Sequence, residues 1–197
     1  MDETALIEQA KRGDIEAFNT LVLHYQDAVY NLAYRILGDH DSASDAAQEA
    51  FISAYRALKR FRGGSLKPWL MRIVTNACYD ELRRRQRRPT AALEALHTVN
   101  PDPLVAQPET PEAHAQRSDL SRAIQACLNQ LPDDQRVVVV LSDVEGYDYQ
   151  EIADIAGVSL GTVKSRLSRA RARLRDCLRG VKELLPEAYR LTSDEHE

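Results

Sequence analysis

The sequence has few cysteines, and they are isolated from one another along the chain. Only Cys78, Cys127 and Cys177 occur among its 197 residues. There is no CxxC pair and no histidine at metal-ligand spacing, so the pattern predicts neither a disulfide framework nor a zinc site. We expect each cysteine to be a small buried side chain in a reducing compartment, and we expect no metal and no cofactor.

Long apolar runs are also lacking. The longest is Val137–Leu141, whereas a membrane-spanning helix needs about 20 apolar residues. No segment has the pattern of a signal peptide. We expect a soluble, cytoplasmic protein without membrane insertion, long enough for two small domains.

The chain has no overall positive charge, since its net charge is −4, and this argues against a general DNA-coating protein. The charge is unevenly distributed, however. Residues Arg83–Arg88 include five arginines, and Lys164–Arg175 contains one lysine, five arginines and no acid. Two basic stripes on an acidic protein indicate two separate contacts with nucleic acid.

The second basic stripe belongs to a predicted helix-turn-helix over residues 147–175. Gly157 ends the first helix, and Ser159 supplies an N-cap for the second. Apolar residues then recur at helical spacing as one narrow packing stripe, at Val163, Leu167, Ala170 and Leu174. The opposite side carries small polar residues flanked by guanidinium groups, which suits a DNA major groove. A solvated or partner-binding basic helix is the alternative.

The amino-terminal part predicts three helices. A short one covers about residues 3–12, a longer one runs from Asp14 to about Leu37, and a third follows after Gly38 with Asp39 or Asp41 as its cap. The first half of the third helix is acidic and contains no base. These acids either stabilise the helix N-terminus or form a docking face for a basic partner.

A helix from Pro68 to about Arg85 has two faces. One packs, and the other combines Trp69, Arg72, Asn76 and Tyr79. Aromatic, guanidinium and amide groups together can stack on and hydrogen-bond single-stranded nucleic acid. Trp69 could instead be a buried anchor, and Asp80 is expected to pair with an arginine one turn later.

The middle of the chain, from Pro89 to about residue 115, is rich in proline and acids and predicts a linker, with one short helical turn around residues 91–96. Its acidity suits either a plain solvated tether or a mimic of nucleic acid. Helices are then expected from Ser118 and from Pro132. The run Val137–Leu141 predicts a buried helix, with a strand as the competing possibility.

Two long stretches resemble the extracytoplasmic-function (ECF) class of bacterial sigma factors, in the sigma-70 family. SASDAAQEAFISAYRALKRFRG with PWLMRIVTNACYDELRRRQRR is similar to domain two of that family, and LNQLPDDQRVVVVLSDVEGYDYQEIADIAGVSLGTVKSRLSRARARLR is similar to domain four. The resemblance implies an all-α protein of two small helical domains. It divides the chain into domain two (residues 1–89), a linker (90–117), domain four with its helix-turn-helix (118–180) and a C-terminal tail (181–197).

The resemblance also implies a function without enzymatic activity. The protein would bind RNA polymerase core through the clamp helices and the flap, and would direct it to promoter DNA. The implied clamp contacts are Asp45, Gln48, Glu49 and Phe51. The residues implied for melting and capture of the −10 element are Arg62, Ser65, Trp69, Arg72, Asn76 and Arg83. Those implied for reading the −35 element are Lys164, Ser165, Arg166, Ser168, Arg169 and Arg171.

Within the last group, Arg169 is the candidate for a bidentate guanine contact, while Arg166 and Arg171 are assigned to phosphates. Two departures from the family pattern leave the promoter sequence open: a short Gly-Gly loop before Trp69, and the small Ser168. An anti-sigma partner is a further implication of the resemblance.

Two other functions would account for part of the sequence. A helix-turn-helix repressor or activator would bind a symmetric operator without polymerase, and it would not need the aromatic and amide face of the helix that begins at Pro68. A DNA-processing nuclease would need carboxylates clustered around a metal. The acids of residues 39–49 instead lie beside capping positions, with no histidine or lysine arranged near them.

Overall fold

The structure is a computed structural model that describes residues 2–87 and 111–180. Every regular element within these two stretches is helical, which confirms the all-α prediction. In chain order they are α1 (Glu3–Lys11), α2 (Ile15–Leu37), α3 (His40–Ala57), the 3-10 turn η1 (Leu58–Arg60), α4 (Leu66–Arg87), α5 (Pro111–Asn129), α6 (Asp133–Val139), the π-helical turn η3 (Val140–Val144), α7 (Tyr149–Ala156) and α8 (Leu160–Arg179).

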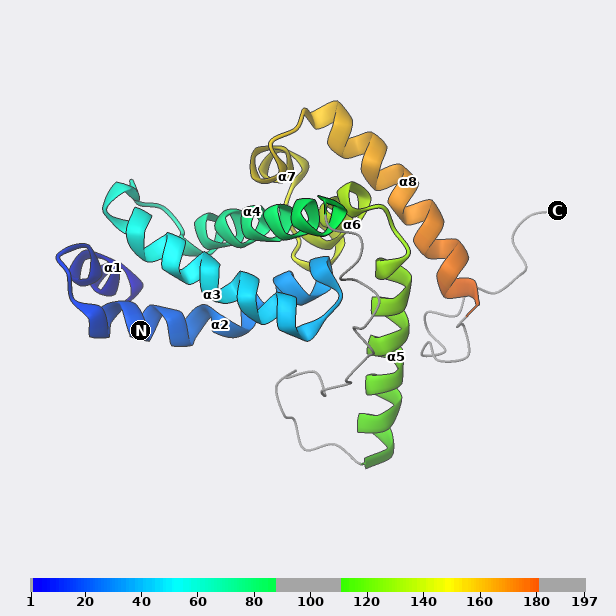
Figure 1. Cartoon of the computed structure of the whole chain (residues 1–197), viewed down its shortest axis with the longest axis horizontal. Coiled ribbons are helices and arrows are strands. Elements are labelled where there is room, and N and C mark those ends of the chain that lie inside the picture. The colour runs from blue at the N-terminus through cyan, green and yellow to red at the C-terminus, as the bar shows by residue number, and fades with distance from the viewer. Residues whose placement is uncertain (1, 88–110, 181–197) are drawn as a thin grey trace.

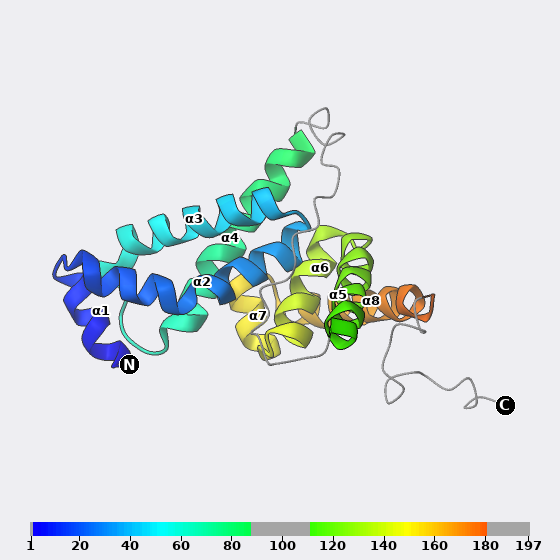
Figure 2. The ribbon, with the colours of Figure 1, turned by 90° about the horizontal axis from the view of Figure 1, so that it is seen from below.

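The first half is a bundle in which α2, α3 and α4 pack on one another and α1 packs on α2 (Figures 1 and 2). Its helix ends follow local capping chemistry. The Asp14 carboxylate accepts hydrogen bonds from the backbone N–H groups of Glu16 and Ala17, at 3.0 and 3.1 Å. Gly38 ends α2 with a left-handed φ of 80°. Asp39, not Asp41, caps α3 by accepting from Ser42 N at 2.8 Å.

The second half contains α5 to α8, with α5 and α8 side by side at the right of Figure 1. Its centre is the valine run. Residues Val137–Leu141 are 0–2% exposed and helical, so the predicted buried helix is confirmed and the competing strand is wrong. Packing inside a helical core outweighs the poor intrinsic helix propensity of valine.

Two predicted helix starts are wrong. Helix α4 begins at Leu66, which places Pro68 within its first turn, and α5 begins at Pro111, which places Ser118 inside the helix. Both differences have one cause. A proline in the first turn costs no backbone hydrogen bond, because the N–H groups there have no intrahelical partner. The short turn predicted at residues 91–96 and the C-terminal tail lie outside the described residues.

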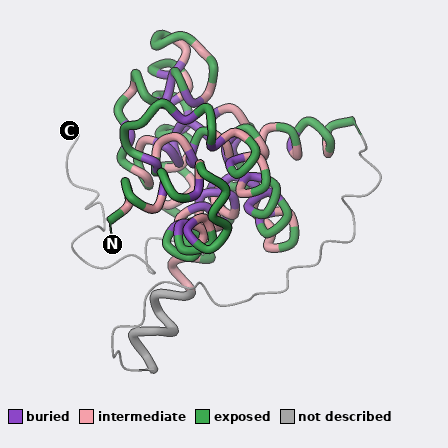
Figure 3. The backbone as a smooth tube through the Cα atoms, turned by 90° about the vertical axis from the view of Figure 1, so that its left-hand side faces the viewer, coloured by how far each residue is buried: buried purple, intermediate pink, exposed green. Residues whose placement is uncertain are grey.

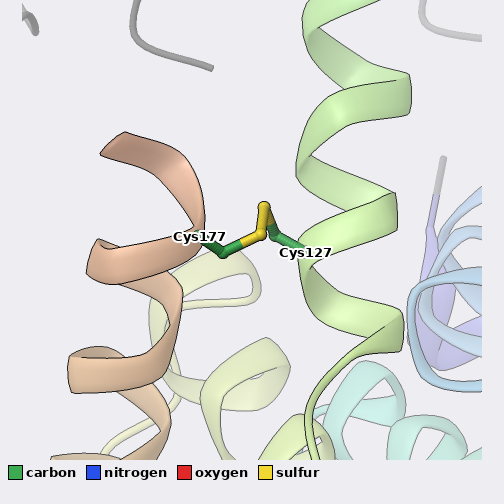
Figure 4. The surroundings of a disulfide bond; sticks show 2 residues. All are labelled: Cys127 and Cys177. Carbon is green, nitrogen blue, oxygen red and sulfur yellow. A yellow bond between two sulfur atoms is a disulfide. The ribbon is translucent and has the colours of Figure 1, made fainter. Parts of the chain in front are cut away.

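The cysteines also correct the sequence-based expectation. Cys127 on α5 and Cys177 on α8 form a disulfide, with their Cα atoms 5.8 Å apart (Figure 4). They are 50 residues apart in the chain. Spacing along the sequence does not show which helices lie side by side, so the pairing was missed. Cys78 is a buried free thiol, as expected.

Buried residues of the two halves form one continuous hydrophobic cluster, concentrated where the helices pack together (Figure 3). Helix α4 packs against α7, and α2 packs against α5. The side-chain amide of Gln125 on α5 donates to the backbone carbonyl of Arg35 on α2, at 3.3 Å. Across the described residues, no helix is both long and apolar enough to cross a bilayer.

Candidate nucleic-acid interface

The helix-turn-helix is built from α7, a short turn and α8. Asp148 and Glu151 form a capping box at the start of α7, and Gly157 ends α7 with a φ of 65°. The Ser159 hydroxyl then accepts from Thr162 N at 3.1 Å and caps α8. The predicted turn chemistry of Gly157 and Ser159 is confirmed. These caps fix the angle at which α8 leaves the turn.

One side of α8 is anchored in the core. Val163, Leu167 and Ala170 are 0–1% exposed, as the predicted stripe requires, and Leu174 is half-buried. Four of the predicted −35 residues lie on the solvent side and are exposed: Lys164, Ser165, Ser168 and Arg169. They project from the first three turns of a rigid helix, so a duplex could approach them without any change in the packing of the helix.

The other two predicted −35 residues are engaged within the protein. Arg166 is half-buried, and its Nε lies 3.0 Å from a carboxylate oxygen of Asp134. Arg171 forms two bonds to Asp143, from Nε at 3.0 Å and from Nη2 at 2.6 Å. It also donates to Ser142 Oγ at 3.2 Å. The hydrogen bond to Asp143 raises the pKa of Arg171, and Arg171 ties α8 to the η3 turn.

The predicted −10 residues lie on α4 and on the loop before it. Arg62, Ser65, Arg72, Asn76 and Arg83 are exposed. Trp69 is half-buried, and its ring packs against Phe61 with 5.1 Å between centroids. Trp69 therefore combines an anchoring contact with a partly accessible face. Asp80 pairs with Arg83 at 3.3 Å, as expected for an intrahelical ion pair.

Tyr79 marks where this face of α4 meets the second half. The ring is half-buried, and burial raises the pKa of its phenol, with Arg166 and Asp134 among the nearby charges. On the same helix, Gln86 Nε2 donates to Asp133 at 3.2 Å. Acids from the start of α6 thus lie against the nucleic-acid face that the sequence predicts for α4.

The predicted polymerase contacts lie on α3. Asp45, Gln48 and Glu49 are exposed on one face, whereas Phe51 is half-buried and packs on the core. The prediction from the sequence missed two apolar residues beside these contacts on α3, Ile52 (38% exposed) and Tyr55 (41% exposed). They continue the exposed face at i+4 and i+7 from Gln48, and that periodicity could have identified them.

The comparisons with known proteins identify the family of this chain. Sigma-70 region 2 matches residues 21–88, and Sigma-70 region 4 matches residues 121–174. The chain is 39% identical over 170 residues to the RNA polymerase sigma-H factor of Pseudomonas aeruginosa, covering 84% of this chain and 88% of that protein. It is 37% identical over 181 residues to the ECF RNA polymerase sigma factor SigW of Bacillus subtilis, covering 89% and 96%.

A solved structure has a similar fold. The sigma factor RpoE, in complex with the anti-sigma factor NepR from Bartonella quintana, superposes with a TM-score of 0.63 at 28% identity, over 82% of this chain and 96% of that one.

The chain therefore belongs to the ECF class of the sigma-70 family. It is a transcription initiation factor without enzymatic activity of its own. Such a factor binds RNA polymerase core and directs it to promoters, with region 4 on the −35 element and region 2 on the −10 element.

Proposed function

We propose that the exposed row Lys164, Ser165, Ser168 and Arg169 reads the −35 element in the major groove. The observation that carries this proposal is the geometry of α8, a capped helix anchored by a buried stripe whose opposite side presents donors to solvent. Arg169 reaches a guanine edge in bidentate fashion, and Lys164 contacts phosphate. Arg166 joins the phosphate contacts once it leaves Asp134, whereas Arg171 positions the helix through Asp143.

At the −10 element, the loop residues Arg62 and Ser65 and the α4 residues Arg72, Asn76 and Arg83 hold the separated strand. Trp69, supported by Phe61, offers the accessible part of its ring to an unstacked base. Stacking on an aromatic side chain is worth about 1–3 kcal/mol per base. Unpairing a base costs a few kcal/mol, so the stacking and the polar contacts together offset that cost.

The exposed face of α3 docks on the polymerase clamp helices through Asp45, Gln48 and Glu49, with Ile52 and Tyr55 beside them. Phe51 supports this face from the core side. The second half, taken as residues 118–180, contacts the flap, and residues 1–89 form the first domain. The protein acts in the cytoplasm. An anti-sigma factor that covers these surfaces is a further expected partner, as in the RpoE–NepR complex.

Transcription in vitro tests the whole assignment. RNA polymerase core, with and without the protein, is given sheared genomic DNA from the source organism, and the new 5′ ends are sequenced. We expect starts that depend on the protein and share two upstream motifs at fixed spacing. Starts that are identical without the protein, together with binding of the protein alone to a palindrome, would favour the repressor alternative.

Replacement of Arg169 by alanine tests the base contact. Arg169→Ala should lower promoter affinity of the holoenzyme by roughly 1–3 kcal/mol and relax selectivity at one −35 base pair. Arg173→Ala, an exposed arginine four positions further along α8, is the matched control and should leave that selectivity unchanged. If holoenzymes with wild type and with Arg169→Ala bind a series of variant promoters in the same order of affinity, the assignment is refuted.

A further inference from the structure

Cys127 and Cys177 join the helix that reads DNA to its neighbour in the fold (Figure 4). Cys127 lies on α5 between Gln125 and Asn129, and the side-chain amides of these two residues hydrogen-bond to each other at 3.0 Å. Gln125 also contacts α2 through the Arg35 carbonyl. The α5 end of the disulfide is therefore held by contacts with the rest of the protein.

The α8 end of the disulfide lies where the packing of that helix is weakest. The fully buried stripe of α8 ends at Ala170, and beyond it Leu174, Cys177 and Leu178 are only half-buried. Among the described residues, Arg171 is the last on this helix whose side chain is seen to hydrogen-bond to another element, because Arg179 forms an exposed ion pair with Asp176 of α8 itself. The sulfur–sulfur bond thus anchors the last two turns of α8.

We propose that Cys127 and Cys177 form a reversible thiol–disulfide switch that sets how firmly α8 is held and, with it, the affinity for the −35 element. This inference rests on the proposed function of α8 and on the proposed cytoplasmic location. In a reducing cytoplasm the pair is held as two thiols, and a low-molecular-weight disulfide such as oxidised glutathione closes it.

The exchange proceeds in two steps. The Cys177 thiolate attacks one sulfur of oxidised glutathione, forming a mixed disulfide and releasing one glutathione thiolate. The Cys127 thiolate then attacks the Cys177 sulfur and releases the second. Two protein thiols are oxidised, one glutathione disulfide is reduced to two thiols, and the two protons pass to the released thiolates. Exposure fixes this order, because Cys177 is half-buried whereas Cys127 is only 2% exposed.

Cys78 does not compete for the exchange. It lies on α4 with 0% exposure, and burial raises the pKa of its thiol to about 12. A buried thiol that stays protonated is a poor nucleophile. The protein therefore contains one reactive pair and one inert thiol, which serves as an internal control.

The test uses the full-length protein equilibrated with either reduced or oxidised glutathione. The glutathione is removed before polymerase core is added, so that cysteines of the polymerase are not affected. Alkylation of the denatured protein with a polyethylene glycol maleimide counts the free thiols. Thermal unfolding and promoter affinity of the holoenzyme are measured on the same samples. Cys177→Ser cannot form the disulfide and so represents the reduced protein. Cys78→Ala is the matched control.

For wild type we expect three alkylated thiols after reduction and one after oxidation. Oxidation should raise the melting temperature by about 10 °C, because the crosslink restricts the unfolded chain. It should also tighten promoter binding at least about threefold, since more of the protein holds α8 in its binding position. Cys177→Ser should match reduced wild type in both buffers, and Cys78→Ala should respond like wild type.

Three alkylated thiols after oxidation overturn the proposal. So does a closed disulfide that leaves the melting temperature or the promoter affinity unchanged. Failure of the proposed function is distinguishable from both. Holoenzyme that produces no defined starts in either redox state refutes the sigma-factor assignment of α8, whereas the thiol count and the melting temperature still report on the crosslink.

Discussion

Arg171 is the residue whose role the structure changes most relative to the sequence. A phosphate-binding arginine needs a guanidinium that is accessible to DNA. The Arg171 guanidinium instead donates hydrogen bonds to Asp143, Ser142 and Tyr149. The network is partly exposed, with 44% of the Arg171 side chain and 38% of the Asp143 side chain accessible. We therefore expect that replacing Arg171 changes the stability of the protein modestly and has only a small direct effect on DNA binding.

The first prediction concerns Arg171→Met. Loss of the clamp should lower the free energy of unfolding by about 1 kcal/mol in urea denaturation. The salt dependence of promoter binding should keep its slope, because a neutralised arginine releases no counterion. Arg173→Met is the control for loss of one exposed charge on the same helix. If the slope for Arg171→Met falls by about one relative to wild type, Arg171 contacts phosphate after all.

Asp39 should make the stability of the first half sensitive to acid. Burial raises the pKa of its carboxyl, but the hydrogen bonds from Ser42 and the ion pair with Arg85 outweigh burial, so the net pKa is lowered. A carboxyl with a lowered folded-state pKa stabilises the fold above its unfolded value of about 3.9. That stabilisation is lost as the pH falls from there through the folded-state pKa.

The second prediction is drawn from Asp39→Asn. Asparagine still caps α3, so the variant loses mainly the charge. Wild type should be more stable than the variant at about pH 7, and this difference should shrink as the pH falls below about 4. Urea unfolding across that range measures it. The pKa of Asp143 is also lowered. Because Asp143 is present in both proteins, its contribution to the pH dependence cancels in the difference between them. A difference that stays constant with pH contradicts the prediction.

At the scale of helices, the sequence predicts the features that depend on residues close together in the chain, such as helix caps and helix ends. The caps at Asp14 and Ser159 and the stop at Gly157 are local chemistry, and the structure confirms them. The π-helical turn at Val140–Val144 was missed, because it leaves the apolar pattern of a helix unchanged. The Cys127–Cys177 pair depends on two distant helices lying side by side, and no local pattern encodes that arrangement.

The candidate site divides in the same way. Helical periodicity predicted the exposed row of α8, because side chains on one face of a helix follow from spacing alone. It could not predict that Arg166 and Arg171 meet Asp134 and Asp143, since those acids belong to α6 and η3. Charge along one helix therefore overestimates how many of its arginines are available to DNA.

The third prediction tests the start of the helix-turn-helix. The Asp148 carboxylate accepts from Gln150 N and Glu151 N, both at 2.8 Å. Asp148→Ala should therefore lower the free energy of unfolding by about 1 kcal/mol, whereas Asp148→Asn should lose only part of that. Urea denaturation followed by circular dichroism compares the two. Equal stability of Asp148→Ala and wild type would mean that packing alone holds α7.

At the scale of the whole molecule, the contact between the halves limits what the free protein can do. Lys67 of α4 lies 3.8 Å from Glu145, and the acids at the start of α6 lie beside Tyr79 and Gln86. Part of the candidate DNA surface of α4 therefore meets protein before it meets a promoter. We expect the halves to move apart when the protein reads two separated elements at once, with the binding energy of polymerase core as the source for that change.

The last prediction tests the contact between the halves at Gly38. A Cβ atom added to Gly38 would lie 2.4 Å from Oδ1 of Asn129 on α5, and Gly38 has a left-handed φ of 80°. Gly157 also ends a helix with a left-handed φ, of 65°, but a Cβ there would meet nothing within 4 Å. Alanine at either position carries a similar backbone cost, of order 1 kcal/mol.

Only Gly38→Ala should also push α5 away from α2. We expect it to lose more stability than Gly157→Ala and to increase the radius of gyration measured by small-angle X-ray scattering. Because we expect the halves to separate on the promoter, transcription by polymerase core with the Gly38→Ala variant should be retained at temperatures where the variant stays folded. Equal losses for the two variants, with an unchanged radius of gyration, would show that the Gly38–Asn129 contact does not hold the halves together.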